Sequence, residues 1–378
     1  LEPAIQTAKS GAIINNAHEY LFKILDPILS HTKTGEILFK PNGKTIKAGE
    51  RFKNPDFANY LEQIIIEGSN FLYRGDLTDK IDVFMEDGGL LTKEDFSNYE
   101  VIERTPLKTD FNGKTIITNP MPSPGGTLIA FALKIISRKF PGKEINNRLL
   151  TLVMRLAQTA RSEVISAKNK TDSLAEILSP IYFKRFLDFF DSEISLKPNK
   201  EKLCSGSTTH MSIIDSQGSA ASVTTTNGEG CGYIIPGTGI MINNMLGEED
   251  LNPDGFHNWE TTKRMETMMS PTIVIGDFGP ELVLGSGGSN RIRSAIKQVI
   301  LNKFTKNMNL EEAIQAPRIH LEENIIHCEP GINTAKLSFP WSTIHHWHEK
   351  NLFFGGVNAV TPTNAVGDPR RSGYGLVR

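Results

Sequence analysis

The residue pattern changes abruptly near residue 208, and this change most limits the folds available to the chain. Before it the pattern is mainly helical, and residues 197–207 are dominated by Lys, Glu, Asn, Ser and Gly, as in an exposed linker. After it, Met211–Asp215 and Ala220–Thr226 flank a Ser-Gln-Gly turn, which is typical of a β-hairpin. The strand-rich part has too few helices to cover its own sheets, so we predict that both parts pack into one α+β body.

Periodicity and end signals place the other elements. Helices are predicted over Pro3–Leu25, Asn54–Glu67, Thr127–Arg138, Asn147–Lys168, Asn290–Asn302 and Leu310–Gln315. A second hairpin is predicted over 105–118 with its turn at Asn-Gly, and short strands over Ile240–Asn243, Thr272–Ile275 and Leu282–Leu284.

Composition excludes two classes of function. The chain has 41 basic and 43 acidic residues and no long basic run, so no nucleic-acid partner is expected. No stretch of 18 apolar residues occurs, so no membrane span is predicted. The first residues do not look like a signal peptide and lack an initiator Met. We therefore expect the chain to begin inside a longer gene product, and its compartment stays unknown.

Cysteine and histidine usage does not point to a metal or redox site. Cys204, Cys231 and Cys328 form no CxxC pair and no even-numbered disulfide framework. The cluster HHWH at 345–348 has no second ligand group at a recognisable spacing. The pattern therefore favours a partly exposed structural role for these histidines.

Thr208 begins the strand that follows the linker, in the run Gly-Ser-Thr-Thr-His. A threonine hydroxyl is a poor nucleophile and needs a base. If Thr208 became the first residue of a chain, its own α-amino group, which titrates at roughly 7.7–8.0, would be that base. The same hydroxyl could attack the preceding carbonyl and cut the bond between Ser207 and Thr208. A threonine pair at a strand start is also ordinary strand composition, and Thr209 fits the same local logic, so this motif alone leaves both readings open.

A glycine-rich run, GSGGS at 285–289, ends a predicted strand and opens a helix. Backbone N–H groups in such a turn can stabilise an oxyanion, although the same residues suit an ordinary turn. Asn290 stands where a dinucleotide-binding fingerprint needs its last glycine, and no βαβ unit surrounds the run. Dinucleotide binding is therefore not predicted.

Taken together, these segments resemble the gamma-glutamyltranspeptidase family over nearly the whole chain, from about Pro3 to Tyr374. The strongest stretches are GGLLTKEDFSNYEVIERTP (88–106), NPMPSPGGT (119–127), STTHMSIIDSQGSAASVTTT (207–226), PGTGIMINNM (236–245), MSPTIV (269–274), GSGGSNRI (285–292) and GDPRRSGYG (367–375). The resemblance implies an α+β fold, the four-layer αββα sandwich of the N-terminal-nucleophile hydrolase type.

The resemblance also implies a precursor that cuts itself into a heterodimer. Residues 1–207 would be the large-subunit portion and 208–378 the small-subunit portion, together one αββα body. The family attacks the γ-glutamyl amide of glutathione-like compounds, forms a γ-glutamyl ester, and passes the acyl group to water or an amino acid. It uses no metal or organic cofactor. The resemblance favours a periplasmic or extracellular location and leaves the cytoplasm open.

Roles carry over from the family residue by residue. Thr208 is the first threonine of the Thr-Thr-His motif and matches the nucleophile, which selects it over Thr209. Thr226 matches the threonine that hydrogen-bonds and orients the nucleophile. Gly288 and Ser289 match the positions whose backbone amides form the oxyanion hole. The second of these is glycine in typical members, and a glycine-only conformation would not survive that change.

The residues that match the substrate-recognition shell have changed more. Thr267 matches a serine that grips the substrate α-carboxylate, and Met268 replaces a second such serine. Met245 replaces a polar residue that helps hold the α-amino group, and Glu248 aligns with the acidic partner of that amine. Asn227 is the poorly aligned counterpart of an asparagine beyond the orienting threonine. The arginine that clamps the α-carboxylate in the family would lie before residue 1.

We therefore predict a divergent γ-glutamyl amide hydrolase or transferase that processes itself and works through a Thr208 ester. Lost polar contacts to a zwitterionic substrate weaken discrimination, because each unpaired charged end costs binding energy. Two alternatives stay open. One is an amide hydrolase of the same superfamily, either an acylase or a poly-γ-glutamate processing enzyme. The other is a non-catalytic homologue.

Overall fold

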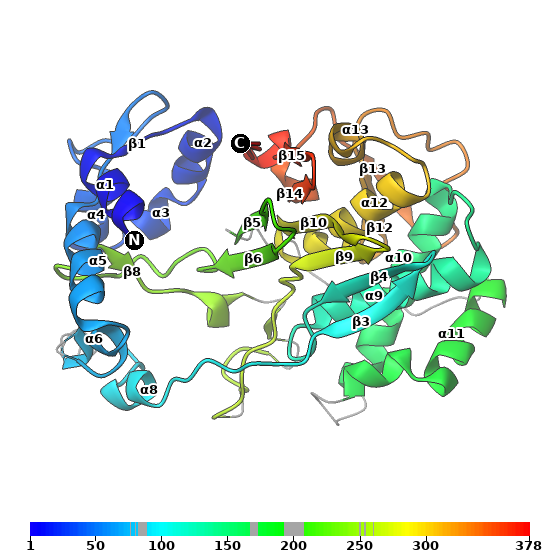
Figure 1. Cartoon of the computed structure of the whole chain (residues 1–378), viewed down its shortest axis with the longest axis horizontal. Helices are drawn as coiled ribbons and strands as arrows, with labels where there is room; N and C mark the ends of the chain where they lie inside the picture. The colour runs from blue at the N-terminus through cyan, green and yellow to red at the C-terminus, as the bar shows by residue number, and fades with distance from the viewer. Residues whose placement is uncertain are drawn as a thin grey trace. The chain divides into compact units, whose positions relative to one another are not determined.

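The computed structural model describes residues 1–75, 77–79, 81, 89–166, 173–192, 208–248, 251–252, 255–259 and 261–378. They form two compact units, one of residues 1–103 and 227–245, the other of residues 104–226 and 246–378 (Figure 1). Each unit has its own cluster of buried hydrophobic side chains. This division follows contacts in space, so the cleavage boundary between 207 and 208 stays a prediction.

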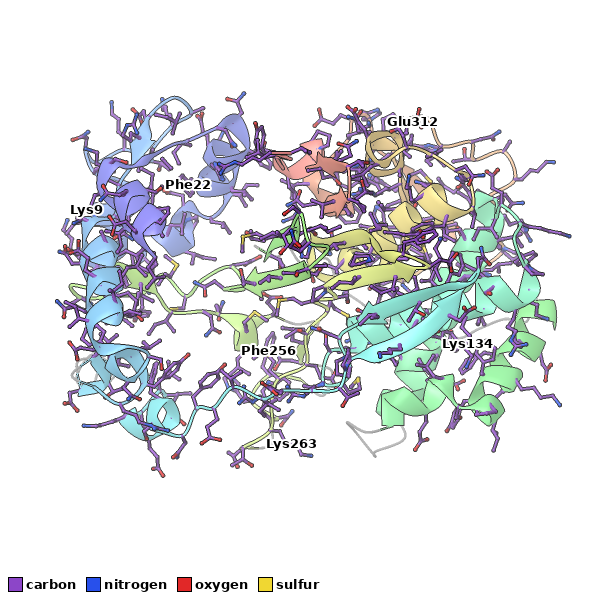
Figure 2. The ribbon with its side chains drawn as sticks, viewed as in Figure 1. Lys9, Phe22, Lys134, Phe256, Lys263 and Glu312 are labelled. Carbon is purple, nitrogen blue, oxygen red and sulfur yellow. The ribbon has the colours of Figure 1, made fainter. Side chains whose placement is uncertain are left out.

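The first unit is mainly helical. Its described helices are α1 (Glu2–Ser10), α2 (Asn16–Ile24), α3 (Asp26–Leu29), α4 (Lys33–Phe39), α5 (Pro55–Glu67), α6 (Asn70–Tyr73) and α8 (Lys93–Ser97). Two short antiparallel pairs complete it, β1 (Ala12–Ile13) with β2 (Arg51–Phe52) and β7 (Ile234–Ile235) with β8 (Ile240–Met241). The rings of Phe22, Phe39 and Phe52 pack together, with centroids 5.5–6.2 Å apart; Figure 2 labels Phe22.

The prediction of one helix over Pro3–Leu25 is wrong, because this segment forms two helices, α1 and α2. Gly11 ends α1 with a φ of +86°, a conformation that costs glycine little and other residues more. The Asn15 side chain then accepts a hydrogen bond from the His18 amide and caps α2. By contrast, the predicted start of α5 is confirmed, since the Asn54 side chain accepts from the Phe57 amide.

The second unit holds the larger sheets. Its described helices are α9 (Pro124–Lys139), α10 (Asn147–Ser166), α11 (Pro180–Ser192), α12 (Ile292–Phe304) and α13 (Leu310–Gln315). Its main sheet runs in the order β15 (Asn364–Val366), β14 (Gly356–Thr361), β10 (Gly279–Gly287), β9 (Thr272–Gly276), β4 (Lys114–Thr118) and β3 (Leu107–Phe111). Two further sheets are the hairpin β5 (Thr208–Ile214) and β6 (Ala220–Thr226), and β11 (Ile319–Glu322), β12 (Ile325–Cys328) and β13 (Thr343–His346).

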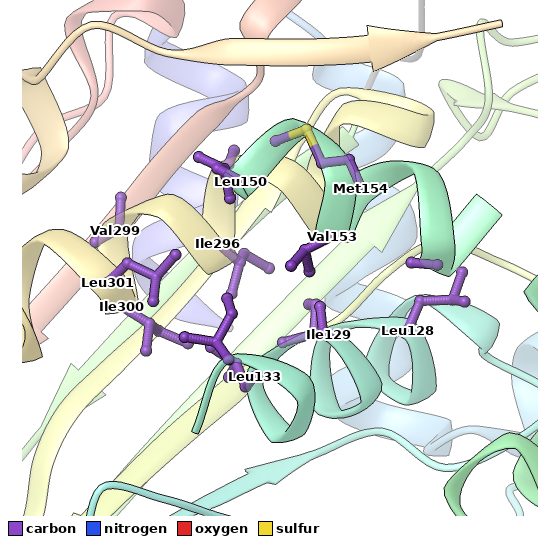
Figure 3. Packing of buried hydrophobic residues seen from close by; sticks show 14 of the residues in the cluster. Leu128, Ile129, Leu133, Leu150, Val153, Met154, Ile296, Val299, Ile300 and Leu301 are labelled. Atoms are coloured by element: carbon purple, nitrogen blue, oxygen red, sulfur yellow. The ribbon is translucent and has the colours of Figure 1, made fainter. Parts of the chain in front are cut away.

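The strands of the main sheet carry different side chains on their two faces, as period-2 alternation requires. On β10, Leu282 and Leu284 join the buried cluster that α9, α10 and α12 build on one face (Figure 3). On the other face, Gly285 and Gly287 lie against the β5–β6 hairpin. This unit is therefore layered as helices, main sheet and hairpin, and the predicted α+β class is confirmed. Lys134 of α9 (Figure 2) donates to the Leu178 carbonyl at 3.1 Å.

Several outcomes follow for the other predictions. Both hairpins are confirmed, with β3–β4 and β5–β6 each antiparallel. Helix α9 begins at Pro124, three residues before the predicted Thr127, because Pro suits the first helical turn. Strands β11 to β15 were not predicted. The expected linker, Cys204 and Ser207 lie outside the described residues.

Three further observations concern only the part of the chain that the structure describes. No described helix is long and apolar enough to cross a membrane. Cys231 and Cys328 are unbridged thiols. The described residues contain no group of three or more His, Cys, Asp or Glu that could hold a metal ion. His345 and His346 lie exposed on β13, in keeping with a structural role.

Candidate active site

The β5–β6 hairpin brings the two predicted catalytic threonines together. Thr208 is the first residue of β5, and the antiparallel register pairs it with Thr226, the last residue of β6. The Thr208 hydroxyl donates a hydrogen bond to the Thr226 Oγ1 at 3.3 Å. Both side chains are half-buried. The hairpin therefore holds the predicted nucleophile beside one hydroxyl acceptor.

Two glycines of β10 let this hairpin approach the main sheet closely. A Cβ atom on Gly285 would lie 2.3 Å from the His210 ring, and one on Gly287 would lie 2.2 Å from the Thr208 carbonyl oxygen. A side chain at Gly285 would displace the buried His210 ring, and one at Gly287 would force a strand to move. The glycine run therefore has a packing role that sequence reasoning did not assign, in addition to any role in binding an oxyanion.

The predicted oxyanion residues form the turn that follows β10. Gly288 has a φ of +124°, outside the range that residues with a Cβ readily adopt. Ser289 has a φ of +49° and begins a short 3₁₀ turn that runs to Arg291. The left-handed conformation at Ser289 is open to residues other than glycine, at a cost of about 1 kcal/mol. The backbone conformation at this position therefore does not require the glycine of typical members.

The C-terminal segment, residues 367–375, contacts this turn. It resembles the family in sequence, but no role was predicted for it. The Arg371 guanidinium lies beside the turn, with Nη1 3.4 Å from the position of a Cβ on Gly287. Its Nη2 donates to the Leu352 carbonyl at 3.2 Å. Burial, and secondarily Arg291, lowers the pKa of Arg371 to about 10, so it stays cationic at neutral pH. A positive charge thus sits close to the predicted oxyanion turn.

A buried ionic network anchors the segment that carries Arg371. Asp368 is fully buried and accepts from Arg318 at 2.6 Å, from Arg370 at 3.2 Å and from the Val357 amide at 2.9 Å. Burial alone would raise the pKa of Asp368, but these two arginines and the backbone donors hold it below its ordinary value. Arg370 also pairs with Glu329 at 2.5 Å. These partners lie far apart in sequence, so spacing could not have revealed them.

His210 follows the two threonines and is a structural residue of the site. Its ring nitrogens contact the Thr224 and Ser212 hydroxyls, each at 2.8 Å. Burial lowers the pKa of His210 to about 4, so the ring is neutral near pH 7. With both nitrogens engaged on β5 and β6, it is not placed to serve as a base for Thr208. The Asn358 side chain also donates to the His210 carbonyl at 2.9 Å and ties β5 to β14.

The two residues predicted to meet the substrate carboxylate differ in exposure. Thr267 is half-buried, and its carbonyl accepts from the Ser123 hydroxyl at 2.9 Å. Met268 is 3% exposed and packs in the hydrophobic cluster of the second unit. Its carbonyl accepts from Ser270 at 2.9 Å. The Met268 side chain is therefore a core residue in this structure.

The remaining predicted residues are placed as follows. Glu248, in the second unit, is half-buried, and its carbonyl accepts from the Asn252 side chain at 2.7 Å. Asn227 and Met245 belong to the first unit. Asn227 is exposed and donates to the Met241 carbonyl at 3.1 Å, whereas Met245 is 9% exposed. Ser207, the other side of the predicted cleavage bond, lies outside the described residues.

The chain was compared with known proteins. A family model described as gamma-glutamyltranspeptidase matches residues 1–377. The glutathione hydrolase proenzyme of Pseudomonas aeruginosa is 32% identical over 420 residues, covering 100% of this chain and 73% of that relative. The glutathione hydrolase proenzyme of Escherichia coli is 30% identical, covering 85% of this chain and 60% of the relative. The chain thus spans only part of the length of these relatives.

Acylases are also among its relatives. The acylase ACY 1 proenzyme of Pseudomonas sp. (strain SE83) is 28% identical, covering 95% of this chain and 66% of that protein. Among solved structures, a cephalosporin acylase from Bacillus halodurans superposes with a TM-score of 0.80 at 22% identity, covering 100% of this chain and 73% of that one. At this identity the likeness establishes the fold and does not choose between substrates.

Proposed function

Because this chain belongs to the gamma-glutamyltranspeptidase family, we propose that it is an amide hydrolase that frees its own nucleophile, Thr208, by cutting the bond after Ser207. One observation supports this proposal above the others. The hairpin register pairs Thr208 with Thr226, and their hydroxyl oxygens are 3.3 Å apart. A strand needs no such pair of facing hydroxyls at its end, whereas a threonine nucleophile needs an acceptor that orients its proton.

The chemistry follows from these positions. Once Thr208 is the first residue of a fragment, its α-amino group accepts the hydroxyl proton while Oγ1 attacks the substrate amide carbon. Backbone amides of Gly288 and Ser289 would stabilise the oxyanion, with the Arg371 charge beside the turn. The protonated amine then gives its proton to the leaving amine, and an ester on Thr208 remains. Water, or an amino acid in a transfer reaction, takes the acyl group and restores the hydroxyl.

For the substrate, we propose a γ-glutamyl compound of the glutathione type. Thr267 and Glu248 would bind the α-carboxylate and α-amino group of its glutamyl part, as their counterparts do in the family. Both side chains are half-buried in the second unit, so each retains some exposed surface.

A second candidate is an amide hydrolase that acts on another acyl group. The observation in its favour is Met268, which replaces a carboxylate-binding serine and is buried in the core. Loss of that polar contact weakens the binding of a zwitterion more than the binding of an uncharged acyl group. A panel of glutathione, a γ-glutamyl anilide, poly-γ-glutamate and a side-chain amide of a β-lactam would separate these substrates.

The experiment for the nucleophile compares Thr208→Ala with Thr209→Ala in the full-length protein. We expect the unmodified protein and Thr209→Ala to give two fragments on a denaturing gel, the smaller beginning Thr-Thr-His and Thr-Ala-His respectively. Thr208→Ala should stay as one polypeptide and hydrolyse no γ-glutamyl anilide. Cleavage and wild-type turnover in Thr208→Ala would refute the proposal. An unmodified protein that remains a single band and turns over nothing would identify a non-catalytic homologue.

A further inference from the structure

The start of strand β14 packs against the predicted oxyanion turn. The position of a Cβ atom on Gly288 lies 2.9 Å from the Cα of Gly355, the residue before β14. The Gly356 amide donates to the Ser286 hydroxyl at 3.1 Å, and this hydroxyl donates to the Gly287 carbonyl at 2.7 Å. The first residue of β14 is therefore tied to the strand end from which the turn begins.

Two residues further along β14, Asn358 binds the strand that carries the predicted nucleophile. Its Nδ2 donates to the His210 carbonyl at 2.9 Å, and its backbone carbonyl accepts from the Ser212 hydroxyl at 3.2 Å. Thr208 lies two residues before His210 on the same strand, β5. Strand β14 thus contacts both halves of the predicted site, the oxyanion turn through its first residues and β5 through Asn358.

A second hydrogen bond fixes the orientation of the Asn358 side chain. Its Oδ1 accepts from the Asp368 amide at 3.2 Å. One partner of the side chain is a carbonyl and the other an N–H, so a single orientation of the amide satisfies both. The position of a Cβ atom on Gly373 lies 2.3 Å from the same Oδ1, so the C-terminal segment packs closely on this side chain. Rotation of Asn358 would break at least one of its bonds.

The main sheet offers no side chain beneath this end of β5 that could fix its position. Gly285 and Gly287 of β10 lie there and permit close approach without providing a side chain to hold the strand. The partner strand β6 is held by Ser222, whose hydroxyl donates to the Leu284 carbonyl at 3.1 Å. Ser222 faces a residue of β5 that is four positions from Thr208, whereas the carbonyl that Asn358 binds is only two positions away.

We propose that Asn358 is a positioning residue for the reaction of Thr208. Its amide holds β5 over the main sheet so that the Thr208 hydroxyl lies at a reactive distance and angle from the carbonyl held by the oxyanion turn. Asn358 acts through the His210 backbone and needs no contact with the reacting atoms. The inference rests on the function proposed above, because the role it assigns belongs to self-cleavage and amide hydrolysis. A displacement of about 1 Å in such a geometry slows a reaction by roughly a hundredfold.

The test compares Asn358→Asp with Gln298→Glu in the full-length protein. The new carboxylate at 358 still accepts from the Asp368 amide but offers no donor to the His210 carbonyl. Gln298 is the matched control, on helix α12 in the helical layer. Its Nε2 donates to two backbone carbonyls, each at 2.9 Å, and its Oε1 accepts from a backbone amide at 3.0 Å. Each variant therefore removes an amide donor from a carbonyl, and we expect both to lower Tm.

Self-cleavage and turnover should separate the two variants when they are measured well below each Tm. During cell-free translation, the Asn358→Asp precursor should persist at least tenfold longer than the unmodified precursor on a denaturing gel. Its matured form should show a kcat lower by about ten- to a hundredfold and a nearly unchanged KM for a γ-glutamyl anilide, because displacement of the nucleophile slows chemistry and leaves substrate contacts in place. Gln298→Glu should cleave and turn over at the unmodified rate.

A purely structural role for Asn358 predicts a different outcome. Both variants would then lose Tm and keep normal cleavage and kcat, which would overturn this inference while the unmodified protein still cleaves. A higher KM at constant kcat would also contradict it, because that result would place Asn358 in substrate binding. An unmodified protein that does not cleave would overturn both this inference and the proposed function.

A second variant serves if Asn358→Asp does not fold. The Asn358 side chain is half-buried, so in Asn358→Ala water can reach the His210 carbonyl and the Asp368 amide and replace the lost hydrogen bonds. We expect the same slow cleavage and the same fall in kcat at constant KM. Unmodified rates in Asn358→Ala would refute the positioning role.

Discussion

The position of a Cβ atom on Gly287 lies 2.2 Å from the carbonyl oxygen of Thr208. The last residue of β10 and the first residue of β5 are thus in direct backbone contact, and only glycine permits it. The contact places the predicted nucleophile next to the predicted oxyanion turn, which begins one residue later. The geometry of the site therefore depends on a residue that has no side chain to react.

Replacing Gly287 with Ala should disrupt this contact. The added Cβ would meet the backbone carbonyl of Thr208, so one strand must shift. We expect a stability loss of about 1–3 kcal/mol and loss of self-cleavage. Denaturant unfolding and a denaturing gel would measure both effects. Gly43→Ala is the control, because no atom lies within 4 Å of its added Cβ. Its φ of +71° makes it mildly destabilising, and its cleavage should be normal. Normal cleavage in Gly287→Ala would show that the close approach is not needed.

Replacing Thr226 with Val removes the hydroxyl that accepts from Thr208 and keeps the side-chain shape. We expect turnover to fall about tenfold, because a lost hydrogen bond of about 1–1.5 kcal/mol corresponds to roughly that factor. The matched control is Thr225→Val, which changes the exposed neighbour on the opposite face of β6. Steady-state kinetics on a γ-glutamyl anilide would compare them. Equal kcat values for both variants would remove Thr226 from the catalytic group.

Ser289 tests whether the oxyanion turn works through its backbone. Ser289→Gly should keep full activity, since glycine adopts a φ of +49° at no steric cost and retains the amide. Ser289→Val should lose activity, because a β-branched residue is strongly disfavoured at this φ. If Ser289→Gly lost activity while folding normally, the serine hydroxyl would be the functional group.

Asp368 should be essential for the segment that carries Arg371. Asp368→Asn leaves the buried Arg318 and Arg370 without this carboxylate, and we expect a loss of about 3–5 kcal/mol. Asp277→Asn, on the exposed turn between β9 and β10, should unfold like the unmodified protein. Urea titrations would report the difference. A change below 1 kcal/mol in Asp368→Asn would mean that the network contributes little.

His210 should make stability depend on pH in acid. Its pKa is about 4 in the folded chain against 6.5 ordinarily, so the unfolded chain binds the proton first as pH falls. Stability should therefore be unaffected above about pH 6.5 and should fall by up to about 3 kcal/mol on the way to pH 4. In His210→Gln the slope of folding stability against pH should decrease by about one proton. The similar contribution of His327 should remain.

Local signals in the sequence were sufficient to predict the helices and strands that have strong periodicity or clear end signals. The cap of α5 and both hairpins follow from side chains within a few residues of each other. Strands β11 to β15 were missed because each spans only three to six residues. The two-residue turns that join β11 to β12 and β14 to β15 lack the Asn-Gly or Asp-Gly pair that signals a hairpin, and β13 pairs in parallel with the distant β12. The break at Gly11 was missed because the apolar spacing continues across it.

The sequence by itself determined the α+β class, the threonine at the start of a strand and the glycine run, because these depend on residue type and local order. Only the tertiary structure decided that Gly287 touches the Thr208 carbonyl and that Arg371 lies beside the same turn. It also placed Met268 in the core. Strand register, burial and charge balance arise from contacts between distant segments, and no spacing along the chain encodes them.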